Sequence, residues 1–81
     1  HGSIVHAVAD QAFAVACNSL GSLAIALSMT LNYLAGAADG ETIFAEAMPI
    51  HTGRKISTWK IEVHGVNDKL IASGEAIAYH K

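Results

Sequence analysis

The first 21 residues predict a helix that offers almost no polar face to water. Gly2 and Ser3 are typical of a helix start, where a Ser side chain can cap free backbone N–H groups, and Gly21 is a typical stop. The residues between them are mostly apolar: Ile4, Val5, Ala7, Val8, Ala9, Ala12, Phe13, Ala14, Val15, Ala16 and Cys17. A helix of this kind belongs inside other protein, and the rest of the chain is arranged around it.

Asp10 stands at the middle of this apolar segment. A carboxylate is almost never fully buried unless a partner compensates its charge. His6 lies four residues earlier, on the same face of the helix. The position of Asp10 therefore predicts either a structural pairing with a backbone N–H or a neighbouring His, or a functional carboxylate.

The bulk properties indicate one small domain over residues 1–81 that expects a partner surface. A hydrophobic fraction of 52% is high for 81 residues, and so short a chain buries little surface alone. The net charge of −2 comes without the basic stripe of a nucleic-acid binder. The single Cys17 favours a reducing, cytoplasmic location. The apolar run 4–17 falls short of the roughly 20 residues that a membrane span needs.

The hydrophobic period changes from helical to two after Gly21. Residues 23–33 alternate large and small side chains, which predicts a strand with Leu23, Ile25, Leu27, Met29, Leu31 and Tyr33 on one face. Further strands are predicted at 42–50, 56–64 and 70–79, joined by turns at 39–40, 52–55 and 65–68. Pro49 fits a sheet edge or bulge, and Gly74 fits a bulge or a close backbone approach. The pattern predicts an α+β domain in which an antiparallel sheet wraps around one apolar helix.

Several short motifs carry a family resemblance. They are His1-Gly2-Ser3, Ala9-Asp10, Ala16-Cys17-Asn18-Ser19, Leu31-Asn32-Tyr33-Leu34, Asp39-Gly40-Glu41, Ala45-Glu46-Ala47 and Gly53-Arg54-Lys55. Together they resemble the hotdog-fold acyl-CoA thioesterases, most closely the PaaI-like branch of phenylacetate metabolism. Ser3 departs from that branch, which has a second glycine there. The family's upstream helix and two strands have no counterpart, so we expect a hotdog domain that is incomplete at its N-terminal side.

The resemblance implies which residues act on a thioester. Backbone N–H groups near Gly2 would polarise the carbonyl, and Asp10 would be a general base or a nucleophile. In the family this aspartate faces the loop of the other subunit, so we expect a homodimer or homotetramer with a shared site. Substrate contacts would come from His1, Ser3, His6, Asn18, Gly53, Arg54 and Lys55.

The basic turn 53–55 would hold the phosphates of coenzyme A, although a solvated turn explains Arg54 and Lys55 almost as well. We expect no metal and no redox cofactor, since His1, His6, His51, His64 and His80 are scattered along the sequence. Cys17 has no recognisable His partner, so we expect it to be a packing residue.

Two alternatives to a thioesterase stay open on the sequence alone. A hotdog hydratase would pair its Asp with a His a few residues later, but the next His after Asp10 is His51. A non-catalytic acyl-CoA-binding or structural module is the other alternative, and Ser3 mildly favours it. Release of free thiol from acyl-CoA would separate an enzyme from a binding module.

Overall fold

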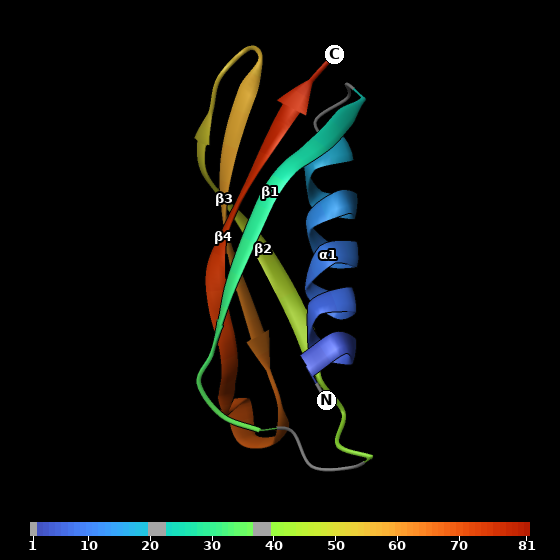
Figure 1. Ribbon diagram of the computed structural model, residues 1–81, viewed down its shortest axis with the longest axis vertical. Coiled ribbons are helices and arrows are strands. Elements are labelled where there is room, and N and C mark those ends of the chain that lie inside the picture. The colour runs from blue at the N-terminus through green and yellow to red at the C-terminus, as the bar shows by residue number, and fades with distance from the viewer. Residues whose placement is uncertain (1, 20–22, 37–39) are drawn as a thin grey trace.

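The computed structural model describes residues 2–19, 23–36 and 40–81 as one helix packed on one four-stranded sheet (Figure 1). The helix is α1 (Gly2–Asn18), and the strands are β1 (Ala24–Tyr33), β2 (Phe44–Thr52), β3 (Ile56–His64) and β4 (Leu70–His80). The strands pair antiparallel in the order β1-β4-β3-β2. The predicted α+β architecture is confirmed, and each predicted strand lies within two residues of its observed bounds.

The helix packs through a single stripe of side chains. Val5, Ala9, Phe13 and Cys17, spaced four residues apart, are buried against the sheet. The Phe13 ring meets the indole of Trp59 on β3 edge to face, with 6.3 Å between centroids. Across the helix, Ile4 and Val15 are 59% and 67% exposed. One sheet covers only one side of the helix, so cover of the other side by a partner stays a prediction.

The start of the helix agrees with the prediction. The helix begins at Gly2, as the pair Gly2-Ser3 predicted. The predicted stop at Gly21 lies outside the described residues, and so does Asp39 of the predicted 39–40 turn. Gly40 has a φ of 75°, a backbone conformation that favours glycine.

The core side of the sheet follows the predicted alternation in β3 and β4. Trp59, Ile61 and Val63 share the buried face, as predicted. On β4 the buried side chains are Ile71, three alanines and His80, and Gly74 brings the backbone of β4 against β1. A Cβ at Gly74 would overlap the carbonyl oxygen of Thr30, so the predicted close approach is confirmed.

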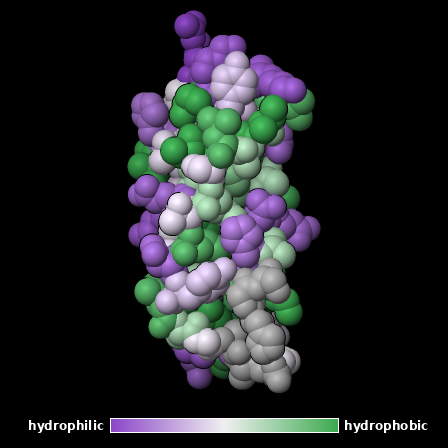
Figure 2. Space-filling view, in the orientation of Figure 1, coloured by the Kyte–Doolittle hydropathy of each residue, from purple (hydrophilic) through white to green (hydrophobic). Residues whose placement is uncertain are grey.

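The predicted apolar face of β1 is wrong at its first half. The pairing of β1 with β4 shifts between Ala26 and Ser28, so Leu27 is an extra, bulged residue. Met29 and Leu31 pack against the core, but Leu23, Ile25 and Leu27 are 63%, 43% and 57% exposed. Figure 2 shows apolar side chains exposed in the upper half of the view, where β1 begins. This edge of the described sheet therefore carries large uncovered apolar side chains.

The opposite edge strand, β2, has its own irregularity. Its pairing with β3 shifts between Pro49 and His51, in line with the predicted edge or bulge position of Pro49. The connection between β3 and β4 is a 3₁₀ turn, η1 (Val66–Asp68), in which Asn67 and Asp68 have positive φ.

A buried polar network closes one end of the core. The Trp59 indole Nε1–H donates to Ser57 Oγ at 2.8 Å, and Ser57 Oγ lies 2.6 Å from Nε2 of His80. Ser57 and His80 are 0% and 5% exposed. The hydrogen bonds offset the cost of burying these groups, so His80 belongs to the structural core and not to a site open to substrate.

Candidate active site on the exposed face of the helix

The N-terminus of α1 supplies backbone N–H groups without partners inside the helix. The first N–H groups of any helix have no intrahelical acceptor, and the helix dipole places partial positive charge there. Gly2 is the first residue of α1 and Ser3 the second. His1, a predicted substrate contact, lies outside the described residues. This end of the helix could stabilise an oxygen that gains negative charge.

Asp10 lies on the side of α1 that faces away from the sheet, and its side chain is exposed. Within the described part of the chain, no side-chain hydrogen bond or ion pair engages it. His6, one turn earlier, is exposed on the same side. The sheet covers the stripe of the helix that starts at Val5, so Asp10 is not buried in a single chain. The carboxylate is open to water and to a second subunit.

The same helix also borders an apolar groove. It encloses about 460 Å³ between α1 and β2 and is lined by Val8, Gln11, Ala12, Val15, Ala16, Ala45 and Ala47. Most of these side chains are small, so the groove has an apolar floor. Gln11 is the polar residue of this lining. Asp10 is not part of the lining, because consecutive side chains of a helix point about 100° apart.

The basic turn lies at the other end of the molecule from Gly2 (Figure 1). Gly53 N–H donates to Ile56 O at 2.9 Å, which closes the hairpin between β2 and β3. Arg54 and Lys55 are exposed, and the Lys55 ammonium lies 5.8 Å from the centroid of the Tyr79 ring. The basic turn and the helix N-terminus of one chain are therefore far apart. The longest dimension of the chain is 39 Å.

Asn18 and Cys17 both serve the end of the helix. The Asn18 side chain donates from Nδ2 to Ala14 O at 2.8 Å and accepts the Ala24 N–H at 3.1 Å, which ties α1 to β1. Contact of Asn18 with substrate stays a prediction. Cys17 is buried, and this burial raises the pKa of its thiol. Its predicted role as a packing residue is confirmed.

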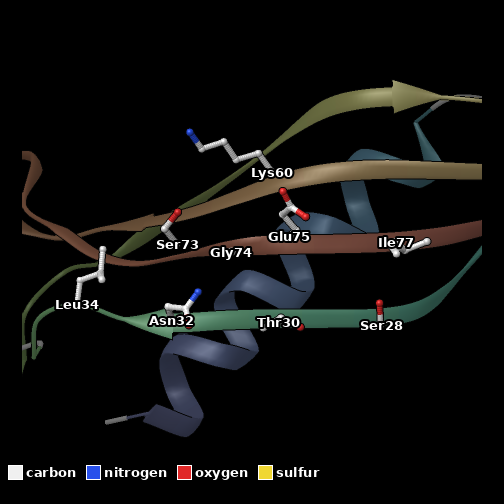
Figure 3. A pocket seen from close by; sticks show the side chains of 9 residues that line it. All are labelled: Ser28, Thr30, Asn32, Leu34, Lys60, Ser73, Gly74, Glu75 and Ile77. Carbon is white, nitrogen blue, oxygen red and sulfur yellow. The ribbon is translucent and has the colours of Figure 1, made fainter.

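A further surface depression lies on the other face of the sheet (Figure 3). It encloses about 680 Å³ and is lined by Ser28, Thr30, Asn32, Leu34, Lys60, Ser73, Gly74, Glu75 and Ile77. None of the predicted site residues is among them. Because α1 and Asp10 are behind the sheet from here, this depression is not the candidate active site.

A polar cluster that the sequence did not predict lies on that same outer face. His64 Nε2 is 3.1 Å from Glu62 Oε1 and 3.9 Å from Glu46 Oε1. The hydrogen bond to the Glu62 carboxylate raises the pKa of His64 and lowers the pKa of Glu62. Glu62 and His64 are two residues apart on β3, so the sequence already placed them on one face of the strand. Glu46 joins them only because β2 pairs with β3.

The chain belongs to the thioesterase superfamily, whose family model matches residues 1–72. A putative esterase of Archaeoglobus fulgidus is 40% identical over 79 residues, which are 98% of this chain and 51% of the relative. The acyl-coenzyme A thioesterase PaaI of Escherichia coli K12 is 36% identical over 72 residues, 89% of this chain and 51% of that protein. The chain thus spans about half the length of these curated relatives.

The fold comparison agrees with the sequence comparison. The solved structure of the E. coli PaaI protein from the phenylacetic acid degradation operon superposes with a TM-score of 0.95 at 32% identity. That match covers 100% of this chain and 59% of the solved one. The hotdog fold and the PaaI-like resemblance are therefore confirmed. Within the described residues, no helix is long and apolar enough to cross a membrane.

Proposed function

We propose that this chain forms the catalytic part of an acyl-CoA thioesterase that hydrolyses an acyl- or aryl-acyl-CoA to the free acid and coenzyme A. The observation that carries the proposal is the exposed Asp10 carboxylate on α1, the same helix whose N-terminal N–H groups have no intrahelical acceptor. Membership of the thioesterase superfamily supports it, as does the similarity to a relative named as an acyl-coenzyme A thioesterase. The phenylacetic acid operon of that relative favours an aryl-acyl substrate.

The chemistry needs two protein groups and water. The N–H groups at the Gly2 end of α1 polarise the thioester carbonyl, and Asp10 removes a proton from the attacking water. The water oxygen bonds to the carbonyl carbon, the carbon–sulfur bond breaks, and coenzyme A leaves as a thiolate that takes up a proton. If Asp10 attacks the carbonyl itself, water instead hydrolyses the resulting anhydride. Neither route uses a metal or a redox cofactor.

The proposed active site is shared between two copies of the chain. About 12 Å of helix separates Gly2 from Asp10, which is too far for both to act on one carbonyl. A two-fold dimer in which the exposed helix faces approach each other antiparallel brings Asp10 of one copy toward the helix start of the other. Ile4 and Val15 are large apolar side chains left exposed in one chain, which supports a dimer that covers this face of the helix.

In the same two-fold dimer, the proposed coenzyme A contacts come from the other copy of the chain. In one chain the basic turn lies at the far end from Gly2, so Arg54 and Lys55 would serve the site built on the helix start of the other copy. Their exposed cations match the charge of coenzyme A phosphates. His6 would line the site beside Asp10, and Ser3 would contact the substrate next to Gly2. A cytoplasmic location, where coenzyme A thioesters are consumed, completes the proposal.

A thiol-release assay tests the proposal. The chain is incubated with acetyl-, hexanoyl-, benzoyl- and phenylacetyl-CoA while free thiol is followed, and binding of each ester is measured in parallel. We expect thiol release that saturates with ester concentration and is fastest for one acyl class. Saturable binding without thiol release would instead show a non-catalytic binding module.

A further inference from the structure

Three side chains from two strands meet on the face of the sheet that is turned away from α1. Glu46 on β2 and Glu62 on β3 are paired in register, and His64 is the next residue on the same face of β3. Each of them offers one possible metal-ligand atom, and these three atoms lie within 4.8 Å of one another. In the described ranges no other three residues among His, Cys, Asp and Glu meet this condition. We call these three residues the outer-face cluster.

The imidazole of His64 is fixed in place with one nitrogen toward the two carboxylates. Its ring stacks on Phe44, with centroids 5.4 Å apart and planes 16° apart. Nδ1 lies 3.6 Å from Asp68 Oδ1, and Nε2 lies between Glu62 Oε1 and Glu46 Oε1. Nδ1 is buried and has no hydrogen-bond partner among the described residues, so the orientation of the ring comes from its stacking on Phe44.

The carboxylates also leave ligand atoms available. Glu62 uses Oε2 for the Lys60 ammonium at 3.3 Å, so Oε1 is the atom that faces His64. Glu46 is 57% exposed at the side chain and can move toward Nε2 without disturbing the core. Since Glu46 and Glu62 are directly opposite like charges, which destabilise a strand pair, a cation between them would relieve this repulsion.

We propose that the outer-face cluster binds one divalent transition-metal ion of the zinc type, through His64 Nε2 and one carboxylate oxygen each of Glu62 and Glu46. Tetrahedral zinc with bonds of about 2.1 Å places its ligand atoms roughly 3.4 Å apart. The observed spacings of 3.1 and 3.9 Å bracket that value. Water completes the coordination, and the imidazole ligand favours zinc or cobalt over magnesium and calcium.

The ion would act as a clamp and not in thioester hydrolysis. Asp10 is on the opposite side of the sheet, and Glu46 belongs to an edge strand of the described sheet. A bound ion ties this edge to β3 and stabilises the fold by mass action. The proposal therefore does not depend on the proposed catalytic function, and metal addition should leave thiol release unchanged.

Metal titration of the tag-free chain tests the site. Zn²⁺ binding is measured by calorimetry, and Co²⁺ is followed by its visible d–d absorption, which reports coordination by protein ligands. We expect one saturable site, weakened at least tenfold by His64→Gln and at least tenfold by Glu46→Gln. The controls His51→Gln and Glu75→Gln should stay within twofold, because neither residue belongs to the outer-face cluster.

Glu46→Gln guards against a folding artefact, because this exposed side chain contributes no core packing. Its circular dichroism and its melting temperature without metal should match those of the parent. The parent, but not Glu46→Gln, should gain in melting temperature when Zn²⁺ is added. The absence of a saturable site in the parent, or equal binding by the parent and His64→Gln, would overturn the proposal.

Discussion

Gly2 and Asp10 lie on the same helix, and about 12 Å of helix axis separates the backbone N–H groups at Gly2 from the Asp10 carboxylate. Both groups are needed at one thioester carbonyl if the helix start polarises it and the carboxylate activates water. The proposed mechanism therefore implies that one chain carries two half-sites. It assigns their completion to a second chain that covers the exposed helix face and the apolar residues at the start of β1.

Complementation between two inactive variants tests the shared site. Gly2→Val blocks close approach of substrate to the backbone, and Asp10→Asn removes the base, so each variant alone should lose activity. Mixed and re-associated, half of the dimers would be hybrids with one intact site of two, which predicts about a quarter of parental activity. Activity no higher than that of either variant would show that the two residues act from the same chain.

Light scattering on the parent should report at least a dimer, and a folded monomer at micromolar concentration would exclude the shared site.

The basic turn predicts a binding effect without a chemical one. Replacing Arg54 and Lys55 together by Ala should raise KM for acyl-CoA several-fold and leave kcat unchanged, because exposed phosphate contacts bind ground state and transition state alike. The difference should shrink as salt rises, since exposed charges are screened over about 10 Å at 0.1 M. Lys81→Ala, another exposed cation, serves as the control. An unchanged KM at low salt would reduce the turn to a solvated loop.

The contact of Gly74 with β1 predicts a stability effect. Gly74→Ala should lower the free energy of unfolding by about 1–3 kcal/mol, because the new Cβ overlaps the Thr30 carbonyl and must push two strands apart. Gly36→Ala is the matched control, since a Cβ there meets nothing within 4 Å. Urea unfolding followed by Trp59 fluorescence measures both. Equal stability of the two variants would mean that β1 and β4 are less closely packed than the structure shows.

The buried thiol predicts a slow reaction. Burial raises the pKa of Cys17, so between pH 7 and pH 8.5 the folded chain holds less reactive thiolate than an unfolded one. A disulfide reagent such as DTNB should label the native chain at least tenfold more slowly than the chain in urea. The native rate should still be rising with pH where the rate of the chain in urea has already levelled off. Rapid labelling at pH 7 would show that the thiol is accessible and ionised.

Local pattern was enough for most of the fold. Strict alternation placed Trp59, Ile61 and Val63 on one face, and a mid-strand glycine marked the close approach at Gly74. The pattern failed at Leu27, because a bulge shifts the register by one residue and turns the large side chains outward without any change in composition.

The candidate site was predictable as residues but not as geometry. The helix carrying Gly2 and Asp10 is local, so both positions followed from the sequence. Exposure of Asp10 depends on how much of the helix one sheet can cover, which is a tertiary property. The same holds for the cluster of Glu46 with His64, since only pairing of β2 with β3 brings these residues together. The hydrogen bond from Ala24 N–H to the Asn18 side chain was not predictable either. It forms because the chain reverses direction between α1 and β1.

The most direct test of the proposed mechanism is the turnover of the Asp10→Asn variant with the best acyl-CoA. The amide keeps the size and polarity of the exposed side chain but cannot accept the proton of water. We predict parental circular dichroism, parental oligomeric mass and a near-parental Kd for the ester, with kcat reduced on the order of 10²-fold or more. Asp68→Asn, which alters another exposed carboxylate, is the control and should turn over normally. Near-normal turnover by Asp10→Asn would contradict the assignment of Asp10 as the catalytic group.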